Sequence, residues 1–228
     1  MNMKKGLTRI LIAAVALGIL LPAGLFAFFY LKGGLSEAIA ERKAYRSVAN
    51  QFKNASRKAD MLVTDVSFDE HSNKLRTSVK FTEYTHNGSA LEPKYFTFNG
   101  NVIQMQSMFI KLDGMDIDNA RSLKDKTISL FWKAFLPDGR ATKDLELTKM
   151  NSIPEAYRLK DAEDPKEPEI WTNIWNFTVD PERSDNILIS NVTIRANDRV
   201  FIPGTIYELE IERNGKLKYS TRFLPDRD

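Results

Sequence analysis

The sequence predicts a mainly β domain with helical additions, an antiparallel β-sandwich or partly open barrel, preceded by a transmembrane helix and an amphipathic stalk helix. Three observations predict this organisation. The first is an uncharged apolar run over residues 10–31, and the second is a helical periodicity behind it. The third is the change beyond residue 60 to an alternation of apolar and polar residues that is interrupted by turn sequences.

The apolar run 10–31 is expected to cross a membrane. Its 22 residues carry no charge, and a helix of that length covers a hydrocarbon core of about 30 Å. A cleaved signal peptide is the alternative. Its apolar region is typically only about 7 to 15 residues long, and the best cleavage site here has Leu25 where a small residue is needed. We therefore expect residues 1–9 to form a short basic tail and residues 10–31 to be an uncleaved anchor.

The basic character of the chain is concentrated at its amino end. Four of the 33 basic residues, Lys4, Lys5, Arg9 and Lys32, stand in the first 34 residues, where there is no acid, so residues 35–228 hold 29 basic and 30 acidic residues. This balance provides no basic face for nucleic acid. Although the flank behind the span is nearly as basic as the tail, we expect the tail in the cytoplasm and the domain outside, periplasmic or extracellular.

Residues 32–60 are predicted to form a juxtamembrane amphipathic helix with Ser36 as its N-cap. Apolar residues recur there at alternating spacings of three and four. The stripe consists of Tyr45, Val48, Phe52, Ala55, Ala59 and Leu62. Two interpretations are open: the stripe packs on the β domain, or it pairs with a second copy as a short coiled coil and forms a homodimer.

Residues 61–228 are predicted to form the β domain. Leu75, Thr77, Val79 and Phe81 alternate with polar residues, and similar half-buried patterns occur over 128–135 and 187–194. The turn sequences between them are Asn87-Gly88, Asn99-Gly100, Pro137-Asp138-Gly139, Pro203-Gly204 and Asn214-Gly215. Short strands with such turns are typical of an antiparallel sandwich or a partly open barrel.

The last hairpin permits a prediction of its register. A three-residue loop over 213–215 pairs Ile211 with Leu217 and Glu210 with Lys218, which keeps apolar residues on one face and charged residues on the other. A two-residue turn would pair Ile211 with Lys218, and such a slip would expose the apolar set. We therefore expect the three-residue loop, with its glycine in the left-handed region.

Short helices are predicted within residues 152–180, where the alternation stops. Residues 152–155 resemble a helix start, and Pro168 opens a second helix. Trp171 and Trp175 are one turn apart on that helix and share a face. Exposed tryptophans can anchor a partner, but so short a helix needs to dock on the sheet to be stable. We therefore expect both indoles to be buried.

Several segments stand in the same order as in a known group of proteins. They are FTEY at 81–84, YFTFNGNVI at 95–103, FIKLD at 109–113, SLFW at 129–132 with PDG at 137–139, PEAY at 154–157, IWTNIW at 170–175 with DP at 180–181, and PGTIY at 203–207. Together they resemble an uncharacterised group of bacterial single-pass membrane proteins. The resemblance implies a transmembrane helix, a helical stalk and a C-terminal β-rich domain. It implies no activity, because no function is assigned to that group.

The sequence carries no motif for catalysis or for nucleotide binding. It has no cysteine, no G-x-S-x-G, no phosphate loop and no G-x-G-x-x-G. His71 and His86 are its only histidines. They stand 15 residues apart in turn-like segments, and no third metal ligand can be named. Two surface histidines are therefore the better interpretation.

A calcium loop is suggested by Asp113, Asp116 and Asp118, but Ala120 and Arg121 stand where the EF-hand pattern needs an oxygen ligand and a glycine. A polar turn explains these aspartates better. We therefore predict no catalytic, cofactor-binding or metal-binding residue and no cofactor.

Three classes of function are open. The neutral domain and the missing motifs favour a membrane-anchored, extracytoplasmic, non-enzymatic binding or scaffold module of the cell envelope. Its partners would be the lipid bilayer, through residues 10–31, and an unidentified envelope protein. The alternatives are a carrier of an apolar ligand or lipid and a hydrolase that uses carboxylates. An enclosed apolar cavity would support the carrier, clustered carboxylates in a cleft the hydrolase, and an exposed apolar patch over a packed core the binding module.

Overall fold

A computed structural model of the chain describes residues 28–52, 56–71, 73–113, 121–137, 145–159, 164–195 and 200–224. The chain divides into two compact units, residues 1–43 and 44–228. The expected basic tail, residues 1–9, and most of the expected membrane helix, residues 10–31, lie outside the described residues. Among the residues that the structure describes, no helix is long and apolar enough to span a bilayer.

A helix is described from residue 28 to residue 51. The hydroxyl of Ser36 donates to the carbonyl of Gly33 at 2.8 Å, and both residues lie inside the helix, so the prediction that Ser36 is its N-cap is wrong. Serine can satisfy its hydroxyl on the preceding turn of a helix, so it need not mark the start. The predicted span of 32–60 is also too long at its end, because the helix stops at residue 51.

Strand β1 (Arg57–Asp69) begins four residues before the predicted domain boundary at residue 61. Its side chains alternate: Ala59, Met61 and Val63 are buried, whereas Leu62 is half-buried. This two-residue period is that of a strand. Ala59 and Leu62 therefore point to opposite faces of a sheet and do not continue the helical stripe.

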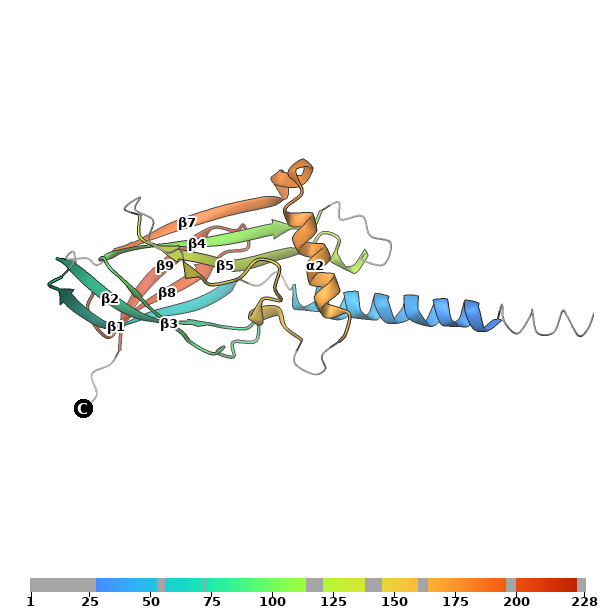
Figure 1. The fold of residues 1–228 in the computed structure, drawn as a ribbon, viewed down its shortest axis with the longest axis horizontal. Helices are drawn as coiled ribbons and strands as arrows, with labels where there is room; N and C mark the ends of the chain where they lie inside the picture. Colours follow the sequence, from blue (N-terminus) through green and yellow to red (C-terminus); the bar gives the residue numbers. More distant parts are fainter. Residues whose placement is uncertain are drawn as a thin grey trace, which may run out of the picture. The chain divides into compact units, whose positions relative to one another are not determined.

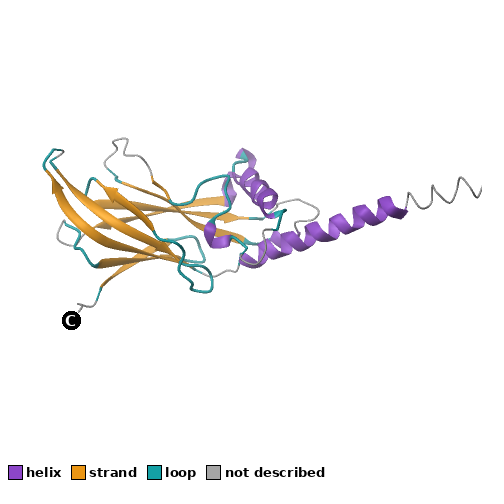
Figure 2. Ribbon diagram, turned by 60° about the horizontal axis from the view of Figure 1, so that its bottom comes forward, coloured by secondary structure: helices purple, strands orange, loops and turns teal. Residues whose placement is uncertain are grey.

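The described part of the domain over residues 44–228 contains two antiparallel sheets (Figure 1). The five-stranded sheet has the order β3 (Lys94–Phe98), β2 (Lys74–Glu83), β1, β8 (Thr205–Ile211), β9 (Leu217–Phe223). The four-stranded sheet has the order β6 (Leu145–Glu146), β5 (Thr127–Phe135), β4 (Val102–Lys111), β7 (Ile187–Arg195). Figure 2 shows the strands of these two layers together with the short helices at one end of the domain. The mainly β, sandwich-like fold predicted from the sequence is confirmed.

The space between the sheets is occupied by a hydrophobic core. The five-stranded sheet contributes Met61 and Phe81, and the four-stranded sheet contributes Met105 and Phe131, all buried. The rings of Phe81 and Phe131 meet edge to face with centroids 5.7 Å apart. Aromatic pairs in this geometry stabilise a core beyond the area that they bury.

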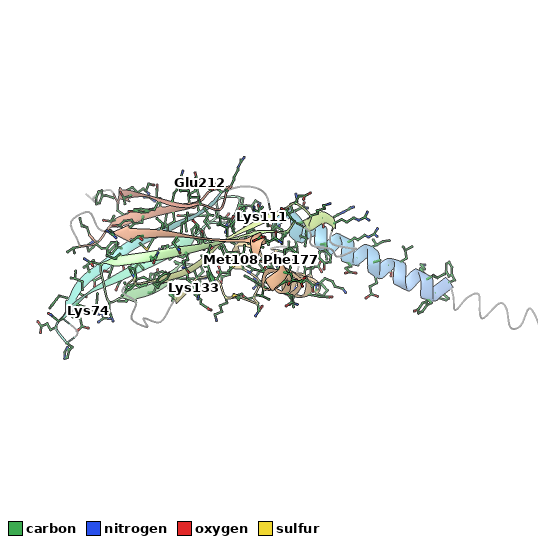
Figure 3. The ribbon with its side chains drawn as sticks, turned by 90° about the horizontal axis from the view of Figure 1, so that it is seen from above. Lys74, Met108, Lys111, Lys133, Phe177 and Glu212 are labelled. Carbon is green, nitrogen blue, oxygen red and sulfur yellow. The ribbon has the colours of Figure 1, made fainter. Side chains whose placement is uncertain are left out.

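The other face of the four-stranded sheet carries a second core. Met108 and Ile110 of β4 point away from Met105, because successive strand residues alternate. They pack with Phe177 of α2 (Glu167–Thr178) and with buried residues between 44 and 52; Figure 3 labels Met108 and Phe177. Residues 128–131 of β5 are buried on both faces, so the prediction that this strand has one wet face is wrong.

The aromatic residues of this second core are tightly grouped. Trp171 and Trp175 are each 1% exposed, which confirms that they belong to the core. The ring of Phe52 meets those of Tyr157 and Trp171 edge to face at 5.4 and 5.6 Å. Tyr45 and Val48 are also buried there, so the described part of the stripe packs on the β domain. The homodimer alternative stays a prediction.

Only one of the two helices predicted within residues 152–180 is an α-helix. Helix α2 corresponds to the second prediction, whereas the first is a single 3-10 turn, η2 (Glu155–Tyr157). Two further 3-10 helices are η1 (Arg121–Leu123) and η3 (Pro181–Asn186).

The predicted register of the last hairpin is confirmed. Ile211 pairs with Leu217 and Glu210 with Lys218, and Gly215 has a φ of +82°. A Cβ on Gly215 would stand 2.8 Å from the Cβ of Phe109, so this position needs glycine for space as well as for conformation.

The two sheets also meet along one edge, because β7 and β9 end their respective sheets. The backbone N–H of Leu217 in β9 donates to the hydroxyl of Ser190 in β7 at 3.2 Å. The sandwich is therefore partly closed at this seam.

Candidate functional site

A trough of about 760 Å³ lies on the face of the five-stranded sheet that points away from the core. The residues that alternate with buried core positions form its floor. They are Lys58 and Asp60 of β1, Glu208 and Glu210 of β8, and Lys218, Ser220 and Arg222 of β9. The turn that follows β2 forms the rim with Tyr84, Thr85, His86 and Gly88.

A chain of hydrogen bonds crosses this floor. The hydroxyl of Tyr84 donates to Oδ2 of Asp60 at 2.9 Å, and Nη2 of Arg222 donates to the same oxygen at 3.1 Å. Nε of Arg222 donates to Oε1 of Glu208 at 2.5 Å, and the hydroxyl of Ser220 donates to Oε2 of Glu208 at 3.2 Å. Four hydrogen bonds thus hold the polar groups of three strands and the rim in one arrangement.

The strand register explains why Arg222 is needed there. Asp60 of β1 stands directly opposite Glu208 of β8, and like charges in that position repel each other. The guanidinium of Arg222 donates to both carboxylates, which offsets the repulsion.

The remaining charges on the floor are also balanced. In the strand register Glu210 stands between Lys58 on one side and Lys218 on the other, while the Nζ of Lys218 donates to Oε1 of Glu212 at 2.5 Å. With Asp60, Glu208 and Arg222, the floor carries three acidic and three basic residues. Its formal charge is therefore zero.

Two groups of the trough, the Tyr84 phenol on the rim and the Arg222 guanidinium on the floor, have raised pKa values. Burial raises the pKa of the Tyr84 phenol, and its hydrogen bond to Asp60 raises it further. The hydrogen bond to Glu208 raises the pKa of the Arg222 guanidinium above its usual value. Tyr84 is therefore a neutral hydroxyl donor and Arg222 a cation at physiological pH.

The rim has its own internal hydrogen bonds. The hydroxyl of Thr85 bonds to the side-chain oxygen of Asn87 and accepts from the backbone N–H of Ser89 at 3.2 Å. Gly88 has a φ of +83°, as the predicted Asn-Gly turn requires. The rim is thus built by a local turn that holds His86 beside the trough.

The residues weighed from the sequence as metal ligands are not brought together. His86 lines the trough, whereas His71 is fully exposed in the turn after β1, beside Asp69. Asp113 is exposed, and Asp116 and Asp118 lie outside the described residues. Within the part of the chain that the structure describes, no group of three or more His, Cys, Asp or Glu side chains could hold a metal ion.

A second, smaller cleft of about 440 Å³ opens beside Glu83, Lys94 and Arg158. Glu83 accepts a hydrogen bond of 2.5 Å from Arg57, a residue only 4% exposed whose guanidinium lies 5.0 Å from the ring centre of Tyr157. Burial raises the pKa of Glu83, and the charge of Arg57 partly opposes that effect. Glu83 is thus the counter-ion of a buried arginine, which gives it a structural role.

Sequence reasoning missed the trough residues Asp60, Glu208 and Arg222. The alternation that places Glu210 and Lys218 on the charged face of the last hairpin also places Glu208 and Arg222 there. The signal for Asp60 was absent, because it stands 162 residues from Arg222 in the sequence.

Comparisons of the chain with models of protein families, with curated proteins and with solved structures found no match.

Proposed function

We propose that the protein is a membrane-anchored, non-enzymatic binding module of the cell envelope, and that the trough on the five-stranded sheet is its binding surface. The proposal keeps the expected anchor, residues 10–31, and places the domain outside the cytoplasm. The observation that carries it is the hydrogen-bond chain from Tyr84 through Asp60, Arg222 and Glu208 to Ser220.

Pre-organisation is the reason that this chain of bonds favours binding. Side chains that are already fixed lose little conformational entropy when a ligand arrives, so more of the interaction energy remains as affinity. The trough volume of about 760 Å³ also falls in the range of small-molecule sites.

Exposed apolar side chains in two neighbouring segments are consistent with the same class of function. They are Val200 and Ile202 in the segment before β8, and Phe223 and Leu224 at the end of β9. The backbone N–H of Leu224 donates to the carbonyl of Gly204 at 3.0 Å, which holds these segments together. Apolar side chains that are exposed together can mark an interaction surface, which is compatible with an envelope protein as a further partner.

The carrier alternative has less support, because the space between the sheets holds the core around Met61, Phe81, Met105 and Phe131. A lipid carrier needs that space for its cargo. We therefore do not propose an apolar ligand.

A hydrolase is the second candidate, because Asp60 and Glu208 form a facing pair of carboxylates in an open trough. Paired carboxylates are the machinery of glycoside hydrolysis. However, both accept hydrogen bonds from Arg222, and a general acid must instead present a proton to the leaving group. This arrangement favours binding over catalysis.

The proposed function can be tested by capture from native membranes with the full-length chain and chemical crosslinking. Arg222→Gln removes the central donor of the floor, and Lys216→Gln removes the same charge from an exposed position of the same hairpin outside the trough. We expect the wild type and Lys216→Gln to capture the same envelope component and Arg222→Gln to lose it. Equal capture by all three proteins would refute the trough as the binding surface. Hydrolysis of the captured component by the wild type would favour the hydrolase.

A further inference from the structure

We infer that the ligand of the trough is a neutral, hydroxyl-rich oligosaccharide. This inference rests on the proposed function and adds the chemical class of the ligand. It is carried by the balance of charge on the floor, by the mixture of donors and acceptors there, and by the position of the trough on the face of a sheet.

The charge balance disfavours an ionic ligand. Asp60 and Glu208 accept hydrogen bonds from Arg222, and Glu210 stands between Lys58 and Lys218 in the strand register. An anion or a cation would meet no excess of opposite charge on the floor, and at Asp60 and Glu208 it would compete with the hydrogen bonds of Arg222. A neutral ligand avoids that competition.

The polar groups left available on the floor suit hydroxyls. Among the described residues, Asp60 makes its hydrogen bonds through Oδ2, so Oδ1 remains an acceptor. Arg222 donates through Nε and Nη2, whereas a guanidinium carries five N–H donors. Acceptors and donors are therefore interleaved over the trough. A sugar hydroxyl both donates and accepts, so neighbouring hydroxyls can engage both kinds of group.

The position of the trough disfavours an extended peptide. Peptide ligands are commonly bound by pairing with a sheet edge, by an apolar groove for a helix, or by aromatic grooves for proline-rich segments. The trough lies on the face of the sheet, where side chains point outward; the backbone groups of β1 and β8 are already used within the sheet, and β9 is the floor strand that stands at the sheet edge. The trough offers a ligand charged side chains and the hydroxyls of Tyr84 and Ser220, which complement a polyol better than a peptide backbone.

The test is affinity electrophoresis and calorimetry on the full-length chain in a detergent without a sugar headgroup. The probes are a panel of neutral glucans, mannans and galactans, together with β-1,4-linked N-acetylglucosamine oligomers of two to six units. The variants are Arg222→Gln and the conservative Asp60→Asn, with Lys216→Gln as the matched control. Circular dichroism verifies that each variant is folded.

We expect at least one neutral saccharide to bind, with an affinity that barely changes with salt because no ion pair forms with the ligand. Arg222→Gln and Asp60→Asn should weaken that binding by about tenfold or more, as expected for loss of a charge-assisted hydrogen bond, and Lys216→Gln should not. A saccharide affinity that neither Arg222→Gln nor Asp60→Asn changes would overturn the inference.

Three further outcomes show whether this inference fails alone or together with the function on which it rests. If capture from membranes depends on Arg222 but the saccharides fail to bind, the ligand class is wrong and the binding module stands. Capture of a peptide, or of a charged polymer whose binding falls steeply with salt, would likewise overturn the ligand class alone. If neither capture nor saccharide binding depends on Arg222, both proposals fail.

Discussion

The indole N–H of Trp175 donates to the backbone carbonyl of Ser152 at 2.8 Å. This bond connects α2 to the segment that leads into η2. Both elements contribute buried residues to the second core. Trp171, one turn earlier on the same helix, is equally buried, but its Nε1 has no hydrogen-bond partner among the described residues. Substitution of one tryptophan or the other therefore distinguishes the contribution of packing to stability from the contribution of the hydrogen bond.

We expect Trp175→Phe to destabilise the domain more than Trp171→Phe. Both changes remove a similar volume from the core, but only the first also removes the donor that satisfies the Ser152 carbonyl. An unsatisfied, partly buried carbonyl costs about 1 to 3 kcal/mol. Urea unfolding followed by far-UV circular dichroism measures the difference, and an equal or reversed order would contradict it.

Gly215→Ala should cost more stability than Gly88→Ala. Both glycines have a φ near +83°, so each alanine loses about 1 to 2 kcal/mol to the left-handed conformation. A Cβ on Gly215 additionally meets Phe109 at 2.8 Å, whereas one on Gly88 meets nothing within 4 Å. The comparison of thermal unfolding for the two variants isolates the steric contribution. Identical losses would show that Phe109 can move away freely.

Glu83→Gln should change how stability depends on pH. Burial raises the pKa of Glu83 above its ordinary value of 4.5, so between that value and the raised pKa the folded protein holds a proton that the unfolded chain has lost. The wild type therefore loses stability as pH rises through this window, and glutamine, which does not titrate, removes that loss. The unfolding free energy of the variant relative to wild type should rise with pH. A relative stability that falls instead would mean that Arg57 outweighs burial.

The chain from Leu35 onward should be a monomer. Tyr45, Val48 and Phe52 are buried against the β domain of the same chain, so they are not available to a coiled coil. Phe52→Ala should then lower the unfolding free energy by about 3 to 5 kcal/mol and leave the sedimentation coefficient of the folded protein unchanged. A stable dimer that this change dissociates would support the homodimer alternative.

Local patterns in the sequence predicted the local parts of the fold. The alternation on both sides of Gly215 was enough to select the hairpin register, because a slip of one residue would expose Ile211 and Leu217. A second local pattern, two tryptophans one turn apart on a short helix, predicted that both are buried, because so short a helix is stable only when one face packs on the sheet.

Features that depend on distant contacts were not predicted. Ala59 fitted the helical stripe by spacing, but the pairing of β1 with β2 and β8 makes it a strand residue. The rim follows β2, and the floor lies on β1, β8 and β9. These segments come together only when β1 pairs with both β2 and β8. No single window of sequence contains Asp60, Glu208 and Arg222 together.

The two histidines permit the most direct test of the trough as the binding surface. His86 lies on its rim and His71 in the turn after β1, outside it, and both are exposed. A photo-crosslinking amino acid is placed at one or the other position in the full-length chain, in native membranes. We predict that position 86 yields a crosslinked envelope component that Arg222→Gln abolishes, and that position 71 yields none. Equal crosslinking from both positions, or crosslinking at 86 that survives Arg222→Gln, would contradict the account.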